Sequence, residues 1–555
     1  MVDRTTLARL ARLVAAEVAA GQPGPNSLAA SRFLEAQPEA VLDVLDMLLA
    51  EWGRKRRNEA LVTAYGYMLG QALEYARYGV EGGVAQAAES VEAVRQRLLA
   101  AGRDKQIEPA LLLMILREFA TAKLDPGPEL RALMDRLTEG MAVSAPGDGD
   151  AGASLAMLDG YIEELAREVG GDPFELYAQV QEMASAFPEE QRAAFGAWLL
   201  ASHEAVAREA ALGWLLDASA SVRNSMLSGI ERAAAHGGVS GVTLRRLIAL
   251  RNWLPEADRL SVDRAIQACR RGALSQNRPF GEGVEVSPWP QVQVREVLAS
   301  VLDGAGAQSL FMLTREGRRS ACACLLLKQG IGVRDAWTRH GLSRAELGEF
   351  LEQAQEIELL PTSLDYARIA TAHALAVNLG SGVMPPFALL DVLETAGLQG
   401  IQPAMLTADA VLASLDAEAD PALSRPEVIA EVLASSRGLP NELAYLDSWF
   451  EADSEVERLL GAKGMTRAKR LALVGDEILP RRAAKWLEKL AWTALTLRHG
   501  EADEPWEAFY VSARELRAGR PIADIPLMMH VAAQTVDAHA AARRGRRIPA
   551  GIRNL

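Results

Sequence analysis

Positions 206–216, VAREAALGWLL, are apolar around most of a helix. One helix face would carry Val206, Ala210, Gly213 and Trp214, and a second face Leu212, Leu215 and Leu216. A helix that is apolar on two faces has to be covered on two sides, which predicts an inner helix of a layered stack. The segment DASAS at 217–221 joins it to the next apolar helix, and so short a turn predicts an antiparallel helical hairpin.

The composition extends this interpretation to the whole chain. Hydrophobic residues make up 49% of the 555 residues but aromatic residues only 5%, so Ala, Leu and Val supply most of the apolar surface. These residues favour closely packed helices, and alternating apolar and polar runs, which are typical of strands, are almost absent. The predicted fold class is all-α: a multi-segment array of antiparallel helical hairpins, solenoid-like at least in part.

Three breaks rich in Gly, Pro, Asp or Ser divide the chain. They are a linker at 144–154, a connector at 275–294 and a linker at 416–426. The segments expected between and beyond them are an N-terminal helical domain (1–143), helical hairpins (155–274), a further helical domain (295–415), a basic helical domain (427–542) and an Arg-rich tail (543–555).

Two acid–base pairs recur at the helical joints. Asp217 and Arg223 are six residues apart, and Asp258 and Arg264 repeat this spacing 41 residues later, while the neighbouring apolar stripe repeats at 40 residues. Over residues 200–272 the chain resembles HEAT-type helical repeats, whose units have about this length. The resemblance implies that these four residues are structural joints in a ladder between neighbouring repeats. Glu209 stands where that family has a proline, and chance spacing of Asp and Arg is the alternative.

A hairpin shaped like a helix-turn-helix is predicted at 330–358. Ser343 and Glu346 form a capping box at the start of its second helix. Several glutamates follow on that helix and would repel phosphates, so we interpret the hairpin as structural. Cys322 and Cys324 are placed in a preceding helix, where residues two apart point to nearly opposite sides. They are therefore predicted to be small buried residues that do not share a metal.

No enzyme signature is found. The seven histidines form no metal-binding pair, and the glycine-containing segments lack the spacing of a phosphate-binding loop. His373, in an apolar helix and on the same face as Tyr366, is predicted to be a buried histidine bonded to a neighbour. The prediction is therefore no catalytic residue, no metal site and no cofactor, although an enzyme with a nonstandard helical site stays open.

The net charge of −14 disfavours general binding to phosphate backbones. The exception is 458–498, which holds ten Lys and Arg residues and three acidic ones, and RKRR at 54–57 is another basic cluster. Such a region could bind an acidic protein, an anionic membrane surface or RNA, or could balance acids of the same chain. The candidate partner-binding residues are Lys463, Arg467, Lys469, Arg470, Arg481, Arg482 and Lys485.

The function expected first is a non-catalytic cytoplasmic scaffold or adaptor of bacterial type that binds a protein partner. The alternative is a nucleic-acid-associated helical protein that uses 458–498 and the tail. No transmembrane segment is predicted, because no window approaches the apolar length that a membrane span needs. Three cysteines fit a reducing compartment.

Overall fold

The computed structural model describes residues 4–19, 24–81, 84–142, 151–236, 238–271, 284–353, 358–462, 464–500 and 505–542. The chain divides into two compact units. Unit 1 comprises Met1–Ala211 with Ala452–Glu455, and unit 2 comprises Leu212–Glu451 with Val456–Leu555. Lys463, the tail at 543–555 and most of the linker at 144–154 lie outside the described residues.

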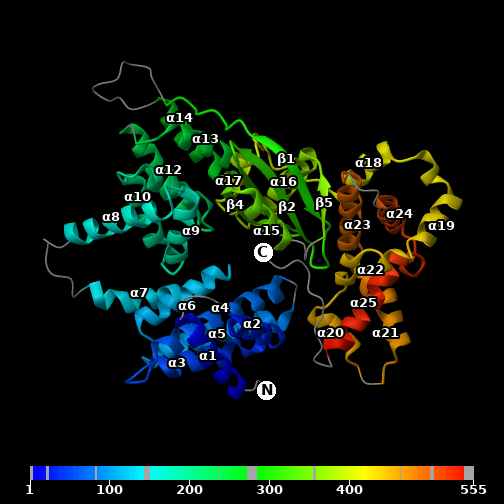
Figure 1. The fold of residues 1–555 in the computed structure, drawn as a ribbon, viewed down its shortest axis with the longest axis horizontal. Helices are drawn as coiled ribbons and strands as arrows, with labels where there is room; N and C mark the ends of the chain where they lie inside the picture. Colours follow the sequence, from blue (N-terminus) through cyan, green and yellow to red (C-terminus); the bar gives the residue numbers. More distant parts are fainter. Residues whose placement is uncertain are drawn as a thin grey trace. The chain divides into compact units, whose positions relative to one another are not determined.

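Unit 1 is built from helices (Figure 1). They are α1 (Arg4–Ala19), α2 (Pro25–Ala36), α3 (Val41–Trp52), α4 (Glu59–Glu81), α5 (Ala85–Arg103), α6 (Pro109–Thr121), α7 (Pro128–Ala142), α8 (Ala151–Glu168), α9 (Pro173–Ala184), α10 (Glu189–Ala201) and α11 (Ala205–Ala210). Helix α8 begins inside the segment that was predicted as a linker, so the linker is shorter than expected.

The core of unit 1 surrounds α4, which packs against α1, α2, α3, α5 and α6. Glycines at 66 and 70 allow α6 to approach α4 closely. A Cβ atom at Gly66 would touch the Met114 sulfur, and one at Gly70 would collide with the Glu118 carboxylate. The close approach therefore depends on small residues one helical turn apart.

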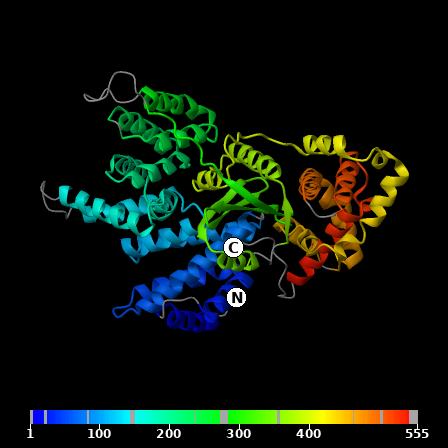
Figure 2. The ribbon, with the colours of Figure 1, turned by 45° about the horizontal axis from the view of Figure 1, so that its top comes forward.

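Unit 2 begins with short helices at the predicted joints. These are η2 (Ala211–Leu216), which starts at the unit boundary, α12 (Ala220–Ala235), α13 (Gly241–Leu250) and α14 (Arg259–Arg271). The buried stripe Val222, Met226 and Ile230 of α12 follows the predicted spacing. Helices α12 and α14 pack against each other and lie side by side among the green helices of Figure 2.

The centre of unit 2 is a five-stranded antiparallel sheet, so the all-α prediction is wrong for this part of the chain. Its strands are β1 (Gln293–Ser300), β2 (Ala307–Glu316), β3 (Arg319–Lys328), β4 (Gly332–Leu342) and β5 (Leu359–Thr362), in the order β4-β3-β2-β1-β5. The first four strands form a meander. The connection from β4 to β5 crosses one face of the sheet through α15 (Arg344–Gln353).

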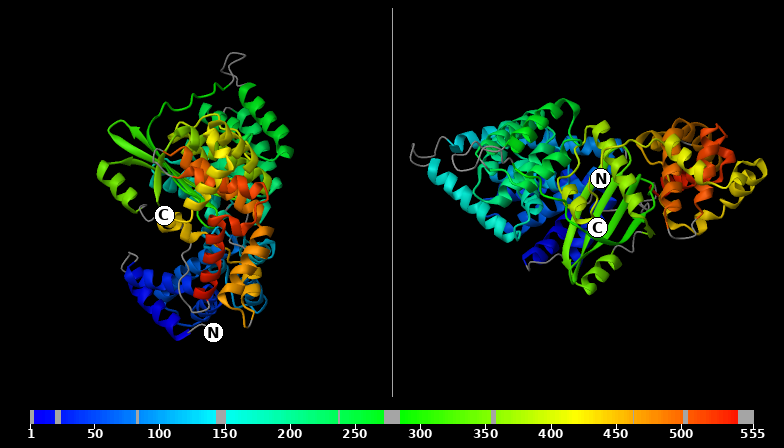
Figure 3. Two further views of the ribbon diagram at one scale, coloured as in Figure 1. Left: turned by 90° about the vertical axis from the view of Figure 1, so that its right-hand side faces the viewer. Right: turned by 90° about the horizontal axis from the view of Figure 1, so that it is seen from above.

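Helices cover both faces of this sheet, which explains why its strands lack alternation. Phe350 of α15 packs on Phe311, Cys322 and Cys324 on one face. On the other face, α16 (Leu364–Ser381) and α17 (Leu389–Thr395) pack on β3 and β4, and Figure 3 shows these helices on the side opposite α15. Strands buried on two faces become continuous apolar runs, which resemble buried helices in sequence.

The predicted hairpin at 330–358 is a strand followed by a helix, not two helices. Residues 332–342 pair with β3 as strand β4. Only the second helix is present, and its capping box is confirmed: the Ser343 amide donates to the Glu346 carboxylate (2.7 Å) and the Glu346 amide donates to the Ser343 hydroxyl (3.2 Å). The capping signal was local and therefore readable, whereas the strand depends on pairing with a distant segment.

The remaining helices of unit 2 follow the sheet. They are α18 (Ala408–Glu418), α19 (Pro426–Ser435), α20 (Ser454–Leu460), α21 (Arg467–Leu473), a π-helical turn (Val474–Ile478), α22 (Leu479–Arg481), α23 (Ala483–Arg498), α24 (Trp506–Arg517) and α25 (Pro526–Ala542). None of the helices in the described ranges combines the length and the apolar character that crossing a bilayer requires.

Candidate ligand-binding site

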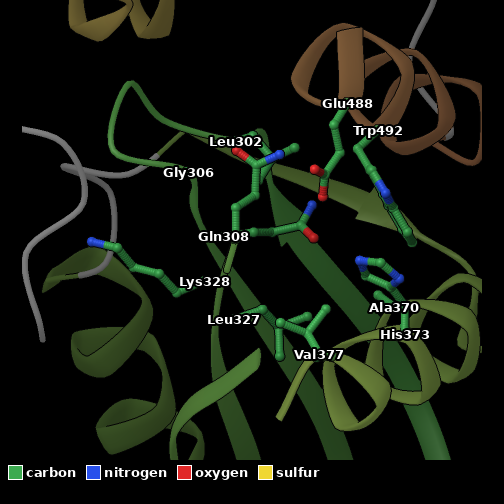
Figure 4. A pocket seen from close by; sticks show the side chains of 12 residues that line it. Leu302, Gly306, Gln308, Leu327, Lys328, Ala370, His373, Val377, Glu488 and Trp492 are labelled. Carbon is green, nitrogen blue, oxygen red and sulfur yellow. The ribbon is translucent and has the colours of Figure 1, made fainter. Parts of the chain in front are cut away.

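A small cavity of about 40 Å³ lies in unit 2 between the sheet and two helices. The loop before β2 and the ends of β2 and β3 form one wall, α16 forms the second and α23 the third. Figure 4 shows Trp492 of α23 above His373 of α16, and Glu488 directed towards Gln308 of β2. Apolar side chains of Leu302, Leu327 and Val377 complete the lining.

His373, the histidine that the sequence analysis discussed, lies on the wall formed by α16. Its Nδ1 accepts the amide hydrogen of Leu406 at 3.2 Å, and its ring centroid is 4.5 Å from that of Trp492. Burial lowers the pKa of His373 to about 4, so the ring is neutral at pH 7. Since Nδ1 accepts a hydrogen bond, the neutral tautomer carries its proton on Nε2, which can donate.

Two further polar groups come from α23. The indole Nε1–H of Trp492 is buried and has no hydrogen-bond partner within the described part of the chain. Burial raises the pKa of the half-buried Glu488, although the nearby Gln329 amide opposes this shift. A buried N–H without a partner is costly, so a ligand that supplied an acceptor would relieve that cost.

The floor of the cavity is fixed by hydrogen bonds behind it. The Gln308 amide donates to the Ser300 carbonyl (2.8 Å) and to the Tyr366 hydroxyl (2.7 Å). Tyr366 also lies 2.6 Å from the Thr496 hydroxyl, and burial raises the pKa of Tyr366 to about 12. These bonds tie β2, α16 and α23 together, so the three walls are held in register before any ligand arrives.

The loop that edges the cavity is held by Lys489, a fully buried lysine of α23. Its Nζ donates to the carbonyls of Asp303 (2.8 Å) and Gly304 (2.6 Å) and lies 4.8 Å from the Trp486 ring centroid. Burial lowers the pKa of Lys489 to about 7. The ammonium is enclosed by carbonyls and aromatic faces and therefore positions the loop without facing the cavity.

Of the four residues predicted to form structural joints, Arg223 and Asp258 bind each other, whereas the side chains of Asp217 and Arg264 each contact a serine nearby in the chain. Arg223 Nε donates to Asp258 at 2.7 Å, both residues are buried, and a second guanidinium nitrogen donates to the Asp217 and Ala218 carbonyls (2.8 Å each). The Asp217 carboxylate accepts the Ser219 amide (2.8 Å). Arg264, in contrast, donates to Ser261 of its own helix (2.9 Å) and does not extend the ladder within the described residues.

Most of the basic residues predicted to bind a partner are bound within unit 2. The buried carboxylate of Glu451 accepts from Arg482 (2.7 Å), Lys485 (3.0 Å) and the Trp486 indole (2.8 Å). Further contacts pair Arg467 with Asp537 (2.8 Å), Arg470 with the Leu460 carbonyl (2.9 Å) and Arg481 with Glu477 (3.7 Å). Lys469 is exposed, and Lys463 lies outside the described residues. Internal contacts thus exist for five of these seven residues, and their role in binding a partner stays a prediction.

The two neighbouring cysteines lie on one face of β3, because residues two apart in a strand point the same way. The placement in a helix with the thiols diverging was wrong. The Sγ atoms are 3.5 Å apart, both side chains are fully buried, and burial raises the pKa of Cys324. Their prediction as small buried residues agrees with this position. In the described residues no cluster of three or more His, Cys, Asp or Glu side chains is arranged to hold a metal.

Sequence reasoning missed Gln308, Glu488 and Trp492 as site residues. Glu488 was counted only as one of three acids in the basic stretch, and Trp492 was not singled out. The one available signal was the spacing of Glu488 and Trp492, which places both on the same face of a helix. Nothing local indicated that this face would meet His373, which lies 115 positions before Glu488 in the chain.

Comparison with known proteins finds similarity in two segments. Residues 188–273 match the family model described as "Y4lR second domain", and residues 409–540 match the "Y4lR C-terminal helical domain". Over 481 residues the chain is 26% identical to "Uncharacterized protein y4lR" of Sinorhizobium fredii (strain NBRC 101917 / NGR234), covering 85% of this chain and 88% of that protein. No solved structure matches. The match at 409–540 contains α23, and the match at 188–273 contains the Arg223–Asp258 pair.

Proposed function

We propose that this protein is a non-catalytic helical-repeat scaffold of the cytoplasm whose sheet module binds a small uncharged ligand. The observation that carries the proposal is the cavity beside His373, which presents neutral donors on fixed walls. Its polar lining consists of His373 Nε2–H, the unpartnered Trp492 Nε1–H, the Glu488 carboxyl group and the side chains of Gln308, Lys328 and Gln329. An apolar cavity with a few fixed polar groups is the usual form of a small-molecule site.

The chemistry of the lining selects the ligand class. Burial keeps His373 neutral, and burial also raises the pKa of Glu488. An anionic ligand would therefore lose its hydration without gaining an opposite charge at His373 or Glu488. A flat amide or heteroaromatic carbonyl compound would instead stack beside Trp492 and accept the two N–H groups.

The lining also favours binding over catalysis. Among the described residues that form the cavity there is no Ser, Thr or Cys that could serve as a nucleophile. Lys489 has the low pKa of an activated amine, but its Nζ is committed to two carbonyls behind the loop. General acid–base work needs a group of suitable pKa within reach of the substrate, and His373 titrates too low to act near pH 7.

Support for the scaffold comes from the buried Arg223–Asp258 pair. It links the first turn of α12 with the turn before α14, which is the position of the ladder in HEAT-type repeats. A second buried contact, in which Arg246 donates to both oxygens of Glu394, joins α13 to α17 of the sheet module. We infer a short repeat stack fixed to the sheet module, with its outer surface open to a protein partner.

Binding of nucleic acid through 458–498 receives less support. Neutralising Arg482 or Lys485 would leave the buried Glu451 carboxylate with fewer partners, so loss of binding in such variants would report on folding. The exposed Lys469 and Arg481 are the residues to test, by replacing both with Glu. We expect folding to be unchanged and RNA binding at low salt to be the same in the wild type and in this variant, so that neither residue contributes to it.

The ligand proposal can be tested with benzamide, nicotinamide and uracil as probes, and with benzoate as a charged comparison. Binding is measured by saturation-transfer NMR and by quenching of tryptophan fluorescence. We expect at least one uncharged probe to bind at millimolar concentration or better and benzoate to bind at least about tenfold more weakly. Trp492→Phe, which removes the N–H donor together with part of the aromatic surface, should weaken binding by at least about fivefold, the loss expected for one hydrogen bond.

The matched control is Trp506→Phe, which changes a tryptophan on α24 that does not line the cavity. It should leave probe binding unchanged. Absence of binding by all three uncharged probes, or equal affinity of the wild type and Trp492→Phe, would refute the ligand site while leaving the repeat scaffold untouched.

A further inference from the structure

A second hollow lies in unit 1 and encloses about 1330 Å³ of space, its open side included. The turn between α3 and α4 and the turn between α5 and α6 form its sides. Five basic residues line it, against two acidic ones: Arg54, Lys55, Arg57, Arg97 and Lys105 against Asp46 and Glu108. Arg54, Lys55 and Arg57 of the RKRR cluster at 54–57 line it, and this cluster is separate from the basic region at 458–498.

The three arginines are each paired with an acid of the same unit. Arg97 donates to Asp46 at 2.8 Å, and Arg54 and Arg57 lie 2.6 Å from Glu51 and Glu59 respectively. These pairs orient the guanidinium groups along the cleft while leaving some of their N–H donors available.

The two lysines are different. Lys55 and Lys105 are both exposed, and within the described ranges neither ammonium group has an ion-pair partner. Lys105 is held in a left-handed backbone conformation (φ 54°) at the turn that follows α5. The cleft thus carries uncompensated positive charge in a chain whose net charge is −14.

An aromatic side chain forms part of the cleft. The guanidinium of Arg57 lies 4.3 Å from the ring centroid of Trp52, and the Trp52 indole donates to Glu108 at 3.2 Å. The ring is thereby fixed in orientation beside the two free lysines. Stacking platforms combined with a cationic groove are the elements with which proteins bind single strands without reading their sequence.

We propose that this cleft binds single-stranded nucleic acid, with Lys55 and Lys105 contacting phosphates and the Trp52–Arg57 pair contacting a base. The occupant follows from shape and charge together. The surface is hollowed and lined by cations and by an indole ring, and the space is far larger than one phosphate group needs. At physiological ionic strength charges beyond about 8 Å are screened, so the acidic remainder of the chain does not prevent binding.

The test uses the full-length protein and a fluorescein-labelled twelve-nucleotide oligouridine, with anisotropy measured from 20 to 200 mM NaCl. The wild type should bind with an affinity that falls as salt rises. The double variant Lys55→Gln with Lys105→Gln should bind about tenfold more weakly at 50 mM NaCl and should lower the log–log salt slope by about 1.4, since each phosphate contact on a single strand contributes about 0.7.

The matched control is Lys469→Gln with Arg481→Gln, which removes the same charge from exposed positions of unit 2. It should retain wild-type binding. Circular dichroism should be unchanged in both double variants, because the replaced side chains are exposed.

Three results would overturn the proposal. They are absence of oligouridine binding at 20 mM NaCl, equal loss of binding in the control, and lysine-dependent capture of phosphatidylserine vesicles without oligouridine binding. None of them concerns the cavity beside His373, so the two proposals fail independently.

Discussion

At the scale of single residues, the most informative group is Lys489. A lysine without any exposed surface is unusual, and here carbonyls of the loop before β2 and the faces of Trp449 and Trp486 replace its hydration. These contacts replace the lost hydration only in part, because burial lowers the pKa of Lys489 to about 7 and so favours the neutral amine. The loop position therefore depends on a group that changes charge near neutral pH.

Replacement of Lys489 by Met should remove a pH dependence of stability. The pKa is about 7 in the folded protein and about 10.5 when unfolded, so the unfolded chain binds more protons between these values. Wild-type stability should rise by up to about 2 kcal/mol from pH 7 to pH 9, relative to Lys489→Met. The measurement is urea unfolding followed by tryptophan fluorescence. Parallel pH profiles of the two proteins would contradict it.

At the scale of elements, the Arg223–Asp258 contact explains how two hairpins remain in register. Both side chains are buried, and the arginine also binds two carbonyls at the end of η2. The carboxylate of Asp258 and the guanidinium group of Arg223 neutralise each other, so neither charge is left unpaired in the apolar interior. The pair is therefore more important as a constraint on geometry than as a source of net stability.

Removal of one partner should be much worse than removal of both. Arg223→Met should destabilise unit 2 by about 3–5 kcal/mol because it leaves Asp258 buried without its counter-charge. The double variant Arg223→Met with Asp258→Asn should recover part of this loss. Arg264→Gln is the control and should cost less than about 0.5 kcal/mol, since Arg264 is exposed. Thermal unfolding distinguishes the three, and equal effects of Arg223→Met and Arg264→Gln would refute the ladder.

At the scale of the whole molecule, the chain consists of two units with their own cores. Each unit contains an ionisable group whose pKa is shifted to about 7, the partly buried Glu118 in unit 1 and the fully buried Lys489 in unit 2, and the two groups have opposite charge types. In unit 1, burial raises the pKa of Glu118, with a further contribution from Glu182, to about 7. In unit 2, burial lowers the pKa of Lys489 to about 7.

The two units should therefore respond to pH in opposite directions. Glu118 binds more protons folded than unfolded between pH 4.5 and 7, so the stability of unit 1 should fall by about 1–3 kcal/mol as pH rises through this window. Unit 2 should gain stability above pH 7. Calorimetry should show two unfolding transitions, one whose midpoint temperature falls between pH 4.5 and 7 and one whose midpoint rises above pH 7. Glu118→Gln should abolish the pH shift of the unit 1 transition only. A single transition, or shifts of the same sign, would contradict the prediction.

The sequence predicted features that depend on neighbours along the chain, and it failed where distant segments meet. Helical stripes such as Val222, Met226 and Ile230 and the Ser343 capping box were readable from local spacing, whereas His373, predicted to be buried, is only partly buried. The sheet was not, because β2 and β3 are apolar on both faces. The role of Arg482 was equally hidden, since its partner Glu451 lies 31 residues away in a segment without a regular pattern.

The placement of α23 has a consequence for biosynthesis. Gln308 hydrogen-bonds to Thr496, so the strand and the helix that meets its end are separated by 188 residues of chain. At roughly 5–20 residues per second, a ribosome needs on the order of 10–40 s to deliver that helix after the strand has emerged. Helices α15, α16 and α17 are synthesised soon after the sheet and can cover its faces in the meantime. The third wall of the cavity beside His373 is therefore the last to be made, and no ligand can be enclosed there before α23 has left the ribosome.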